Sequence, residues 1–227
     1  MSKYWPLSSR AYKVFKTSGS DNSGDVVYTY NQEGFRGDSV DEDIDMVAIG
    51  CSHTEGIGVN DNETWPFYVA SSLGINHINM GFTGRSNDYI SRMTIKAVKQ
   101  YRPKFISVMY TYPVRRELPT KYGFQPFAAN PWGYFEDFPE DYKALTQLSS
   151  QINDKRNWEK NHLLIDSICK LYNTNLVWNG TFADVEEKDQ NRYDGEYKIE
   201  IGKHATPIQN QKYAEGLVGF LKDNSYI

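Results

Sequence analysis

From residue 46 to the end of the sequence, short apolar segments alternate with longer segments of helical periodicity. The apolar segments are 46–50, 77–81, 105–112 and 175–178, and the helical segments are 64–73, 86–101, 158–172 and 207–221. Apolar residues in the longer segments fall roughly three or four positions apart, which indicates helices that bury one face. Alternating strands and helices form βαβ units, whose strands run parallel and whose crossovers are right-handed. The sequence therefore predicts a three-layer α/β/α domain with a parallel sheet of about four or five strands.

One domain accounts for the whole chain, 1–227, because single α/β domains reach roughly 200–250 residues. Two regions depart from the alternation. Residues 1–45 are polar and end in an acidic cluster, which predicts a solvated N-terminal decoration. Residues 114–157 are rich in Pro, Asn, Asp and aromatic residues, and so long a connection is uncommon unless it has a function. Since this insertion follows the carboxyl end of a strand, we expect it to lie over the active edge of the sheet, unless it is a decoration or an oligomer contact.

The composition excludes several classes of protein. The formal net charge is −4 and the pI is about 5.6, so the chain lacks the basic footprint of nucleic-acid-binding domains. No apolar run approaches the ~18 residues of a membrane span, and the N-terminus lacks the apolar core of a signal peptide. The two cysteines, Cys51 and Cys169, are interpreted as free thiols of a reducing compartment. We therefore expect a cytoplasmic protein; the sequence does not indicate its oligomeric state.

The first apolar segment ends in the sequence GCSHTEG, residues 50–56, which places Ser52 directly after a buried strand. Open α/β folds carry their chemistry at the carboxyl ends of the strands. A serine becomes a nucleophile when a base lies within ~2.6–3.2 Å and hydrogen-bond donors stabilise the oxyanion that forms. The search for function is therefore a search for that base and those donors.

The chain offers four histidines as the base. His204 precedes the last helix, in a loop that belongs at the same edge of the sheet as Ser52, and it is the best candidate by topology. His53 follows Ser52 directly, and adjacent side chains diverge, so we expect it to line the pocket. His162 lies within an amphipathic helix, which predicts a structural role, and His77 opens a short strand, which is compatible with an edge position.

Two further strand ends carry candidate groups. The turn 79–88 contains Gly81 and Gly84 before a helix, and a helix N-terminus favours an anion or oxyanion. The alternative is an ordinary turn capped by Ser86 or Asn87. The strand end 110–117 carries two arginines, 115 and 116, which suit a bidentate clamp on a carboxylate or phosphate. The alternative is that Arg116 pairs with Glu117 to brace the insertion.

Taken in order, these segments resemble the SGNH (GDSL-type) hydrolases. Residues 50–56 are similar to the first block of that family, residues 79–86 to its second block, and His204 before a Pro-started helix to its last block. The resemblance spans about residues 46–221, and residues 30–31 and 34–37 are similar to those of bacterial and phage members. It implies a flavodoxin-like α/β/α sandwich of about five strands. It also implies ester hydrolysis through an acyl-serine intermediate, without a metal or another cofactor.

The resemblance also implies roles for individual residues. Ser52 is the nucleophile, His204 the base, and the N–H groups of Ser52 and Gly84 bind the oxyanion. We expect substrate contacts from the residues that flank these positions at the sheet edge, namely His53, Asn87, Tyr112 and Arg115.

Three positions depart from the family pattern. Cys51 stands where the family has an aspartate before the serine. The third strand ends in Tyr-Thr-Tyr without the family's oxyanion-binding asparagine, which leaves Thr111 as a candidate donor. Ile201 stands three residues before His204, where the family has the aspartate that orients the base. Either an aspartate of the preceding loop (Asp184, Asp189 or Asp194) or a backbone carbonyl takes that role.

Two functions follow from this pattern. The first is a serine esterase or deacetylase that acts on a small acyl ester, for example an acylated carbohydrate, and the aromatic residues of 122–135 suit sugar stacking. The second is a catalytically degenerate protein of the same fold that binds a glycan or serves in a larger assembly, which the missing Asn and Asp favour. A nucleotide or phosphate binder is a third reading, but the chain lacks a P-loop and a GxGxxG motif.

Overall fold

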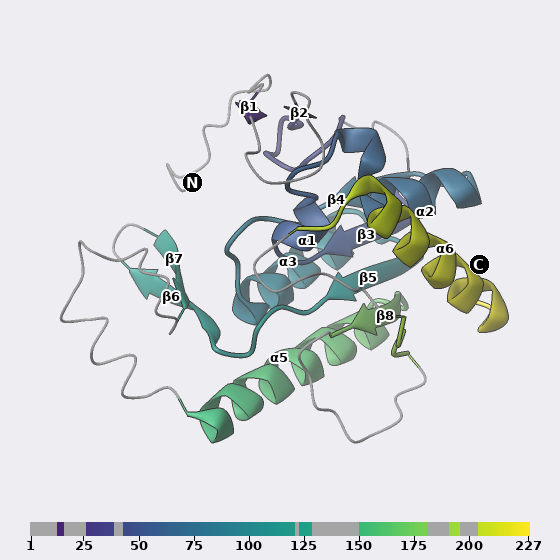
Figure 1. Cartoon of the computed structure of the whole chain (residues 1–227). Helices are drawn as coiled ribbons and strands as arrows, with labels where there is room; N and C mark the ends of the chain where they lie inside the picture. The colour runs from purple at the N-terminus through teal and green to yellow at the C-terminus, as the bar shows by residue number, and fades with distance from the viewer. Residues whose placement is uncertain are drawn as a thin grey trace.

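A computed structural model describes residues 13–15, 26–38, 43–120, 123–128, 150–180, 191–195 and 204–227 of the chain (Figure 1). The strands are β1 (Lys13–Phe15), β2 (Val26–Tyr28), β3 (Met46–Ile49), β4 (His77–Asn79), β5 (Phe105–Met109), β6 (Arg115–Thr120), β7 (Gly123–Ala128) and β8 (Asn175–Asn179). The helices are α1 (Ser52–Glu55), the 3₁₀ turn η1 (Asp61–Glu63), α2 (Trp65–Leu73), α3 (Asn87–Gln100), α5 (Gln151–Leu171) and α6 (Pro207–Asp223).

The central sheet is parallel and has the strand order β4-β3-β5-β8. Met46 at the start of β3 pairs with His77 of β4 and Phe105 of β5, and Phe105 pairs with Asn175 of β8. Because the strands begin in register and run the same way, their carboxyl ends meet at one edge. The predicted α/β/α fold is confirmed, with four strands in the described part of the sheet where about five were expected.

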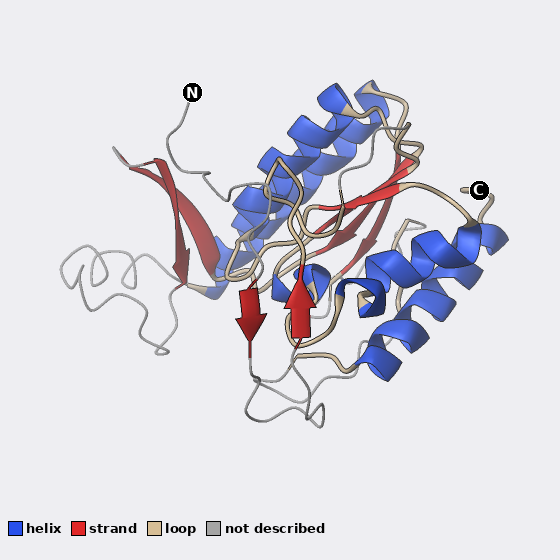
Figure 2. Cartoon of the chain, turned by 90° about the horizontal axis from the view of Figure 1, so that it is seen from above, coloured by secondary structure: helices blue, strands red, loops and turns tan. Residues whose placement is uncertain are grey.

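Helices cover both faces of this sheet (Figure 2). On one face, α3 and α5 pack over a core that includes Val47 and Ile49 of β3. On the other face, α2 and α6 pack over a core that includes Met46 and Ala48. All four residues of β3 are completely buried, as expected for the inner strand of a parallel sheet.

The helices begin and end at residues with ordinary capping chemistry. Thr64 caps α2 by accepting a hydrogen bond from the Phe67 N–H, and α2 ends at Gly74, whose φ of 63° is left-handed. Thr206 begins α6 with a capping box completed by Gln209. Ser86 caps α3 by accepting a hydrogen bond from the Tyr89 N–H, so the cap that the sequence offered to Ser86 or Asn87 belongs to Ser86.

The described parts of the segment 114–157 contain regular secondary structure. Strands β6 and β7 form an antiparallel hairpin, and α5 begins at Gln151 rather than at residue 158 as predicted. Six of the first seven residues of α5 are polar and the other, Ile152, is exposed, so the buried apolar face starts later than the helix itself. The position of the insertion over the active edge stays a prediction, because residues 129–149 lie outside the described residues.

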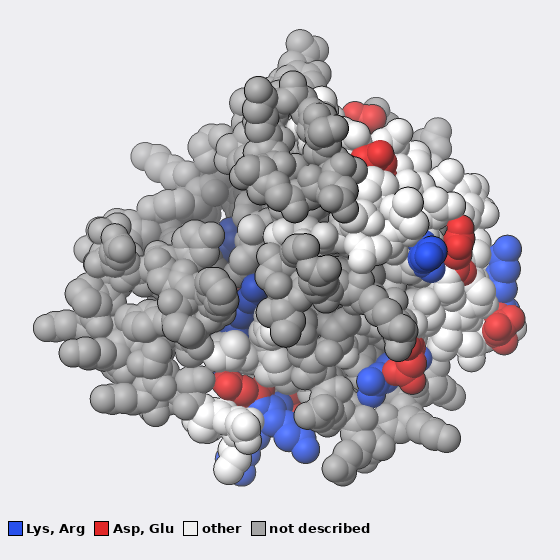
Figure 3. All heavy atoms as spheres, viewed as in Figure 1, with Lys and Arg blue, Asp and Glu red and all other residues white. Residues whose placement is uncertain are grey.

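On the face shown in Figure 3, described lysines and arginines lie close to aspartates and glutamates. Elsewhere in the described chain, ion pairs of 2.7 Å join Lys96 to Glu33, Lys104 to Asp45 and Lys170 to Asp166. None of the described helices has the length and apolar character needed to cross a bilayer.

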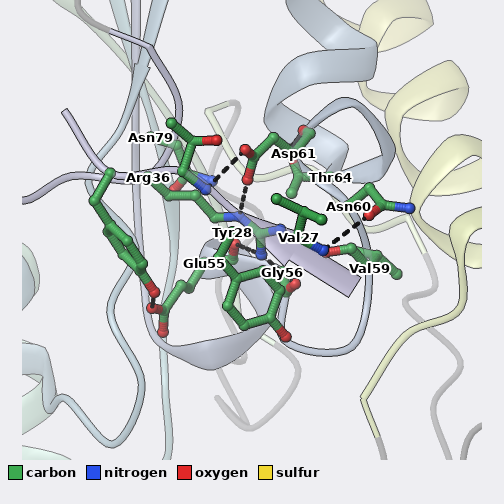
Figure 4. A network of polar contacts seen from close by, with 12 residues as sticks. Val27, Tyr28, Arg36, Glu55, Gly56, Val59, Asn60, Asp61, Thr64 and Asn79 are labelled. Carbon is green, nitrogen blue, oxygen red and sulfur yellow. Dashed lines mark hydrogen bonds and ion pairs between the residues drawn. The ribbon is translucent and has the colours of Figure 1, made fainter. Parts of the chain in front are cut away.

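The segment 26–38 clamps the chain that follows β3 through the buried side chain of Arg36 (Figure 4). Its guanidinium donates to the carbonyl oxygens of Glu55 (2.8 Å), Gly56 and Val59 (2.5 Å). It also pairs with the Asp61 carboxylate at 2.6 Å. One arginine therefore satisfies three carbonyl groups at and beyond the end of α1, where a helix leaves carbonyls without intrahelical partners.

We expect Arg36→Ala to lower the free energy of unfolding by about 3–5 kcal/mol, since it leaves buried carbonyls and an unpaired Asp61 carboxylate. Arg36→Lys retains the charge but cannot reach all four acceptors, so it should lower the free energy of unfolding by an intermediate amount. Urea unfolding measures both values. A loss below about 1 kcal/mol for Arg36→Ala would show that the clamp does not stabilise the fold.

Candidate active site

Ser52 lies in the first turn after β3, at the carboxyl edge of the sheet. Helix α1 begins at this serine, whose exposed fraction is 7 %, and ends at Gly56 with a left-handed φ of 81°. Two glycines allow α1 to pack this tightly. A Cβ on Gly50 would collide with Thr54 and approach the Met109 carbonyl to 2.9 Å, and a Cβ on Gly81 would overlap the backbone at Thr54 and Glu55. The small residues around Ser52 are therefore a steric requirement of the turn.

The structure brings His204 to this turn. Its ring centroid lies 5.2 Å from that of His53, the residue after Ser52, with the two ring planes tilted by 47°. Residues 53 and 204 are far apart in the sequence, so this contact places the loop before α6 against α1. The predicted approach of the base candidate to the Ser52 turn is thus observed, and His53 is the residue of that turn in contact with His204.

Both histidines are held in a neutral state near neutral pH. Burial lowers the pKa of His53 to about 4, and the charges of His204 and Arg115 act in the same direction. Burial also lowers the pKa of His204; Glu55 opposes this shift, and Arg115 adds to it. A neutral imidazole is the form that accepts a proton, so the environment suits His204 to general-base chemistry.

The end of β5 supplies Thr111, which is buried. Asn87 holds its backbone from both sides: the Thr111 N–H donates to Asn87 Oδ1 at 3.0 Å, and Asn87 Nδ2 donates to the Thr111 carbonyl at 3.2 Å. Arg115 Nη1 donates to Thr111 Oγ1 at 2.9 Å. Asn87 is completely buried and its amide bonds the Thr111 backbone, so it positions Thr111; its contact with substrate stays a prediction.

The second strand-to-helix turn contains Gly84, with a left-handed φ of 74°. A Cβ there would meet no atom within 4 Å, so glycine is needed for the backbone conformation rather than for space. The residue before it, Thr83, is bound through its N–H and its hydroxyl to the Glu55 carboxylate of α1. This turn is therefore tied directly to the helix that carries Ser52.

The other predicted residues divide between the site and its supports. Tyr112 is 37 % exposed, and the Arg115 guanidinium lies 5.3 Å from the centre of its ring. Arg116 pairs with Asp154 of α5 at 2.6 Å. The predicted pairing of Arg116 with Glu117 is therefore wrong, because Glu117 pairs with Arg92 of α3 at 2.7 Å. Bracing of the insertion is observed, but through residues distant in sequence.

The other two histidines lie away from the Ser52 turn. His162 stacks on Trp158 with ring centroids 5.1 Å apart and its Nδ1 lies 2.9 Å from the Tyr110 hydroxyl. His77 begins β4, at the edge opposite to Ser52, and burial lowers its pKa to about 4. Neither belongs to the Ser52 turn.

The group that orients His204 was left open between three aspartates and a carbonyl. Asp194 pairs with Arg192 at 2.5 Å and its side chain is 76 % exposed, so the structure gives it a different partner. Asp184, Asp189 and Ile201 lie outside the described residues. Within the described ranges, no group of three His, Cys, Asp or Glu side chains is arranged to hold a metal ion.

Sequence reasoning missed Glu55. This carboxylate is buried, with 3 % exposure, and it accepts hydrogen bonds from Tyr30 and Thr83. A glutamate in a polar turn is normally solvated, and its burial depends on segments 25 residues before and 28 residues after it. The sequence feature that could have identified Glu55 is its position within the GCSHTEG turn, three residues after Ser52.

The sequence matches no protein-family model and no curated protein. The structure is similar to an acetyl xylan esterase, Est2A, from the rumen bacterium Butyrivibrio proteoclasticus, with a TM-score of 0.52 at 10 % identity over 87 % of this chain and 68 % of that one. It is similar to a carbohydrate esterase family 2 enzyme of Corynascus thermopiles (Myceliophthora fergusii), with a TM-score of 0.51 at 10 % identity over 89 % and 73 % of the two chains. It is also similar to TesA, with a TM-score of 0.50 at 8 % identity over 79 % and 98 %. At these identities the likeness establishes a shared fold.

Proposed function

We propose that this protein, which has the fold of the SGNH hydrolases, is a serine-dependent carboxylic ester hydrolase with Ser52 as its nucleophile. The observation that carries the proposal is the contact of His204 with His53 beside Ser52. It brings the His204 imidazole, from the loop before α6, to the turn that carries the Ser52 hydroxyl, which lies at the edge where α/β folds place their chemistry. Shared fold alone would not support an activity, because one fold serves many functions.

In the proposed reaction, the Ser52 oxygen attacks the ester carbonyl carbon while His204 accepts the serine proton. The tetrahedral intermediate collapses when the carbon–oxygen bond of the alcohol breaks, and His204 returns the proton to that leaving alcohol. Water then attacks the acyl-Ser52 ester, again losing a proton to His204, which passes it to Ser52 as the acid leaves. One ester and one water become one acid and one alcohol, and the protein is regenerated.

Three donors are proposed for the oxyanion. The Ser52 N–H lies in the first turn of α1, where backbone N–H groups have no intrahelical partner. The Gly84 N–H comes from the neighbouring turn, and the third donor is the Thr111 hydroxyl. Because Arg115 donates to Thr111 Oγ1, that oxygen is already an acceptor, and its own proton remains available to donate. Thr111 with Arg115 thereby replaces the asparagine that the sequence lacks.

The proposed substrate is a small acyl ester, with an acetylated carbohydrate as the leading example. Two proteins of the same fold are named as an acetyl xylan esterase and a carbohydrate esterase. Near the proposed oxyanion donors, Tyr112 presents an exposed ring beside Arg115, and exposed aromatic rings suit sugars that stack on one face and hydrogen-bond at their edges.

We expect Thr111→Val to lower kcat by about 10²-fold, the cost of removing one oxyanion donor. Valine has nearly the same shape, so KM and the melting temperature should change little. Thr111→Ser keeps the hydroxyl and should retain most of the activity. Thr94→Val is the matched control, because Thr94 is equally buried but bonds within α3 to the Ile90 carbonyl. Equal activity of wild type and Thr111→Val would exclude Thr111 from the oxyanion site.

Steady-state hydrolysis tests the proposed function. The wild-type protein is incubated with p-nitrophenyl acetate, butyrate and octanoate, and with acetylated xylan, and acid release is measured. We expect saturable turnover that is fastest with the acetyl esters. No turnover of any ester would contradict the proposal and favour the non-catalytic protein, which would bind a glycan equally well with Ser52 or alanine at position 52.

A further inference from the structure

Glu55 makes an unusual set of contacts for an acidic side chain in a turn. One carboxylate oxygen accepts a hydrogen bond from the Tyr30 hydroxyl at 2.7 Å. The other accepts from the Thr83 N–H at 2.6 Å and from the Thr83 hydroxyl. The side chain therefore links three segments of the chain while it is itself buried.

Two of these segments carry the proposed chemistry. Glu55 lies three residues after Ser52 in α1, and residues spaced by three lie close together on a helix. Thr83 directly precedes Gly84, which has a left-handed backbone conformation. The Glu55–Thr83 bonds thus connect the turn that carries the nucleophile to the turn that carries the second oxyanion donor.

The backbone at Glu55 is held as firmly as its side chain. Arg36 donates to the Glu55 carbonyl at 2.8 Å, from the same N-terminal segment that supplies Tyr30 (Figure 4). On the other side, Asn79 Nδ2 donates to the Thr54 carbonyl at 2.7 Å. With its carbonyl and carboxylate both engaged, Glu55 has little freedom to change its position relative to either turn.

We propose that Glu55 is a positioning residue that fixes the Gly84 turn against the Ser52 turn, so that the two oxyanion donors converge on one point. This inference rests on the proposed ester hydrolysis. The fold does not need the Glu55 carboxylate to position α1, because Gly50 and Gly81 already allow α1 to pack closely and Arg36 bonds its backbone.

The charge of Glu55 adds a second consequence. The charged and titratable groups that act on His204 are Glu55 and His53 of α1 and Arg115 of β6. Of these, only Glu55 is negative, so it stabilises the imidazolium that forms when His204 takes the serine proton. Neutralising Glu55 should therefore lower the pKa of His204 and move the acidic limb of the kcat/KM profile to lower pH.

The first test compares Glu55→Gln with the wild type. Glutamine is isosteric, but its NH₂ group must face a donor from Tyr30 or Thr83, which should displace the Gly84 turn. We expect kcat to fall about 10- to 100-fold with KM nearly unchanged, since small displacements of reacting groups have effects of this size. Glu33→Gln is the matched control, because the Glu33 carboxylate also accepts three hydrogen bonds, from Lys96, Gln100 and Tyr101, but lies against α3.

The second test separates the two partners of Glu55. Thr83→Val and Glu55→Gln should be strongly non-additive in kcat, because both break the same link. Tyr30→Phe removes the other hydrogen bond and should lower the melting temperature more than it lowers kcat. A loss of activity that follows the melting temperature equally across Glu55→Gln, Tyr30→Phe and Glu33→Gln, without a change of pH profile, would reduce Glu55 to a structural residue and overturn the proposal.

A third measurement does not depend on turnover. In amide NMR spectra, Glu55→Gln should shift the Thr83, Gly84 and Ser52 amides and speed exchange of the Thr83 N–H, whereas Glu33→Gln should not. Unchanged amides would overturn the positioning role even in an active protein. If Glu55→Gln shifts these amides but the wild-type protein cleaves no ester, the link between the two turns is established and the proposed function is contradicted instead.

Discussion

Ser52→Ala is expected to reduce ester hydrolysis by about 10⁶-fold in kcat, the effect of removing the nucleophile from a serine hydrolase. Without the hydroxyl no acyl-enzyme forms, and only binding and the oxyanion donors remain to accelerate direct attack by water. The substitution removes one oxygen from a side chain that is 7 % exposed, so the melting temperature should stay close to that of the wild type.

The rate is measured with p-nitrophenyl acetate, and substrate binding is followed separately. Ser72→Ala is the matched control, because Ser72 lies exposed on α2 and takes no part in the site. A Ser52→Ala protein that retains more than about one hundredth of wild-type kcat would place the chemistry at another residue, since nucleophile loss in such enzymes costs far more.

His204→Ala is expected to lower kcat by about 10⁴- to 10⁶-fold, and the Ser52→Ala, His204→Ala double variant should be no slower than the slower single variant. The reason is that the serine and the base act as one unit, so removing either member removes the shared step. Additive losses in the double variant would show that the two residues act independently.

The pH profile supplies a separate test of His204. A base must be unprotonated, so kcat/KM should fall as the pH drops through the pKa of His204. Burial and Arg115 lower that pKa, which places the midpoint below the ordinary histidine value of 6.5. His53, with a pKa of about 4, titrates lower still. A midpoint above 6.5, or a profile that persists in His204→Ala, would exclude this assignment.

The elements of the fold could be predicted because their signals are local. The apolar runs that became β3 and β5, the cap at Thr64 and the Pro-started α6 each depend on residues within a few positions. The topology then places Ser52 and His204 at one edge without any knowledge of side-chain contacts. For this reason Ser52 and His204, the residues nearest the proposed chemistry, can be identified from the sequence.

The supporting contacts could not be predicted, because each depends on a partner distant in the sequence. The sequence suggests Asn87 as a helix cap or a substrate contact, but its amide bonds the backbone of Thr111, beyond the end of β5. The apparent pair Arg116–Glu117 is split between α5 and α3. Arg36 and Glu55 show the same principle, since tertiary structure alone decides whether a charged side chain is solvated or buried.

The most direct test of the account is the site of covalent modification by a fluorophosphonate, which reacts with an activated serine. After incubation at neutral pH, the protein is digested and the modified peptide is identified by mass spectrometry. The account predicts one adduct, on Ser52, which disappears in Ser52→Ala and forms far more slowly in His204→Ala. No adduct on the wild-type protein, or an adduct on a different serine, would contradict it.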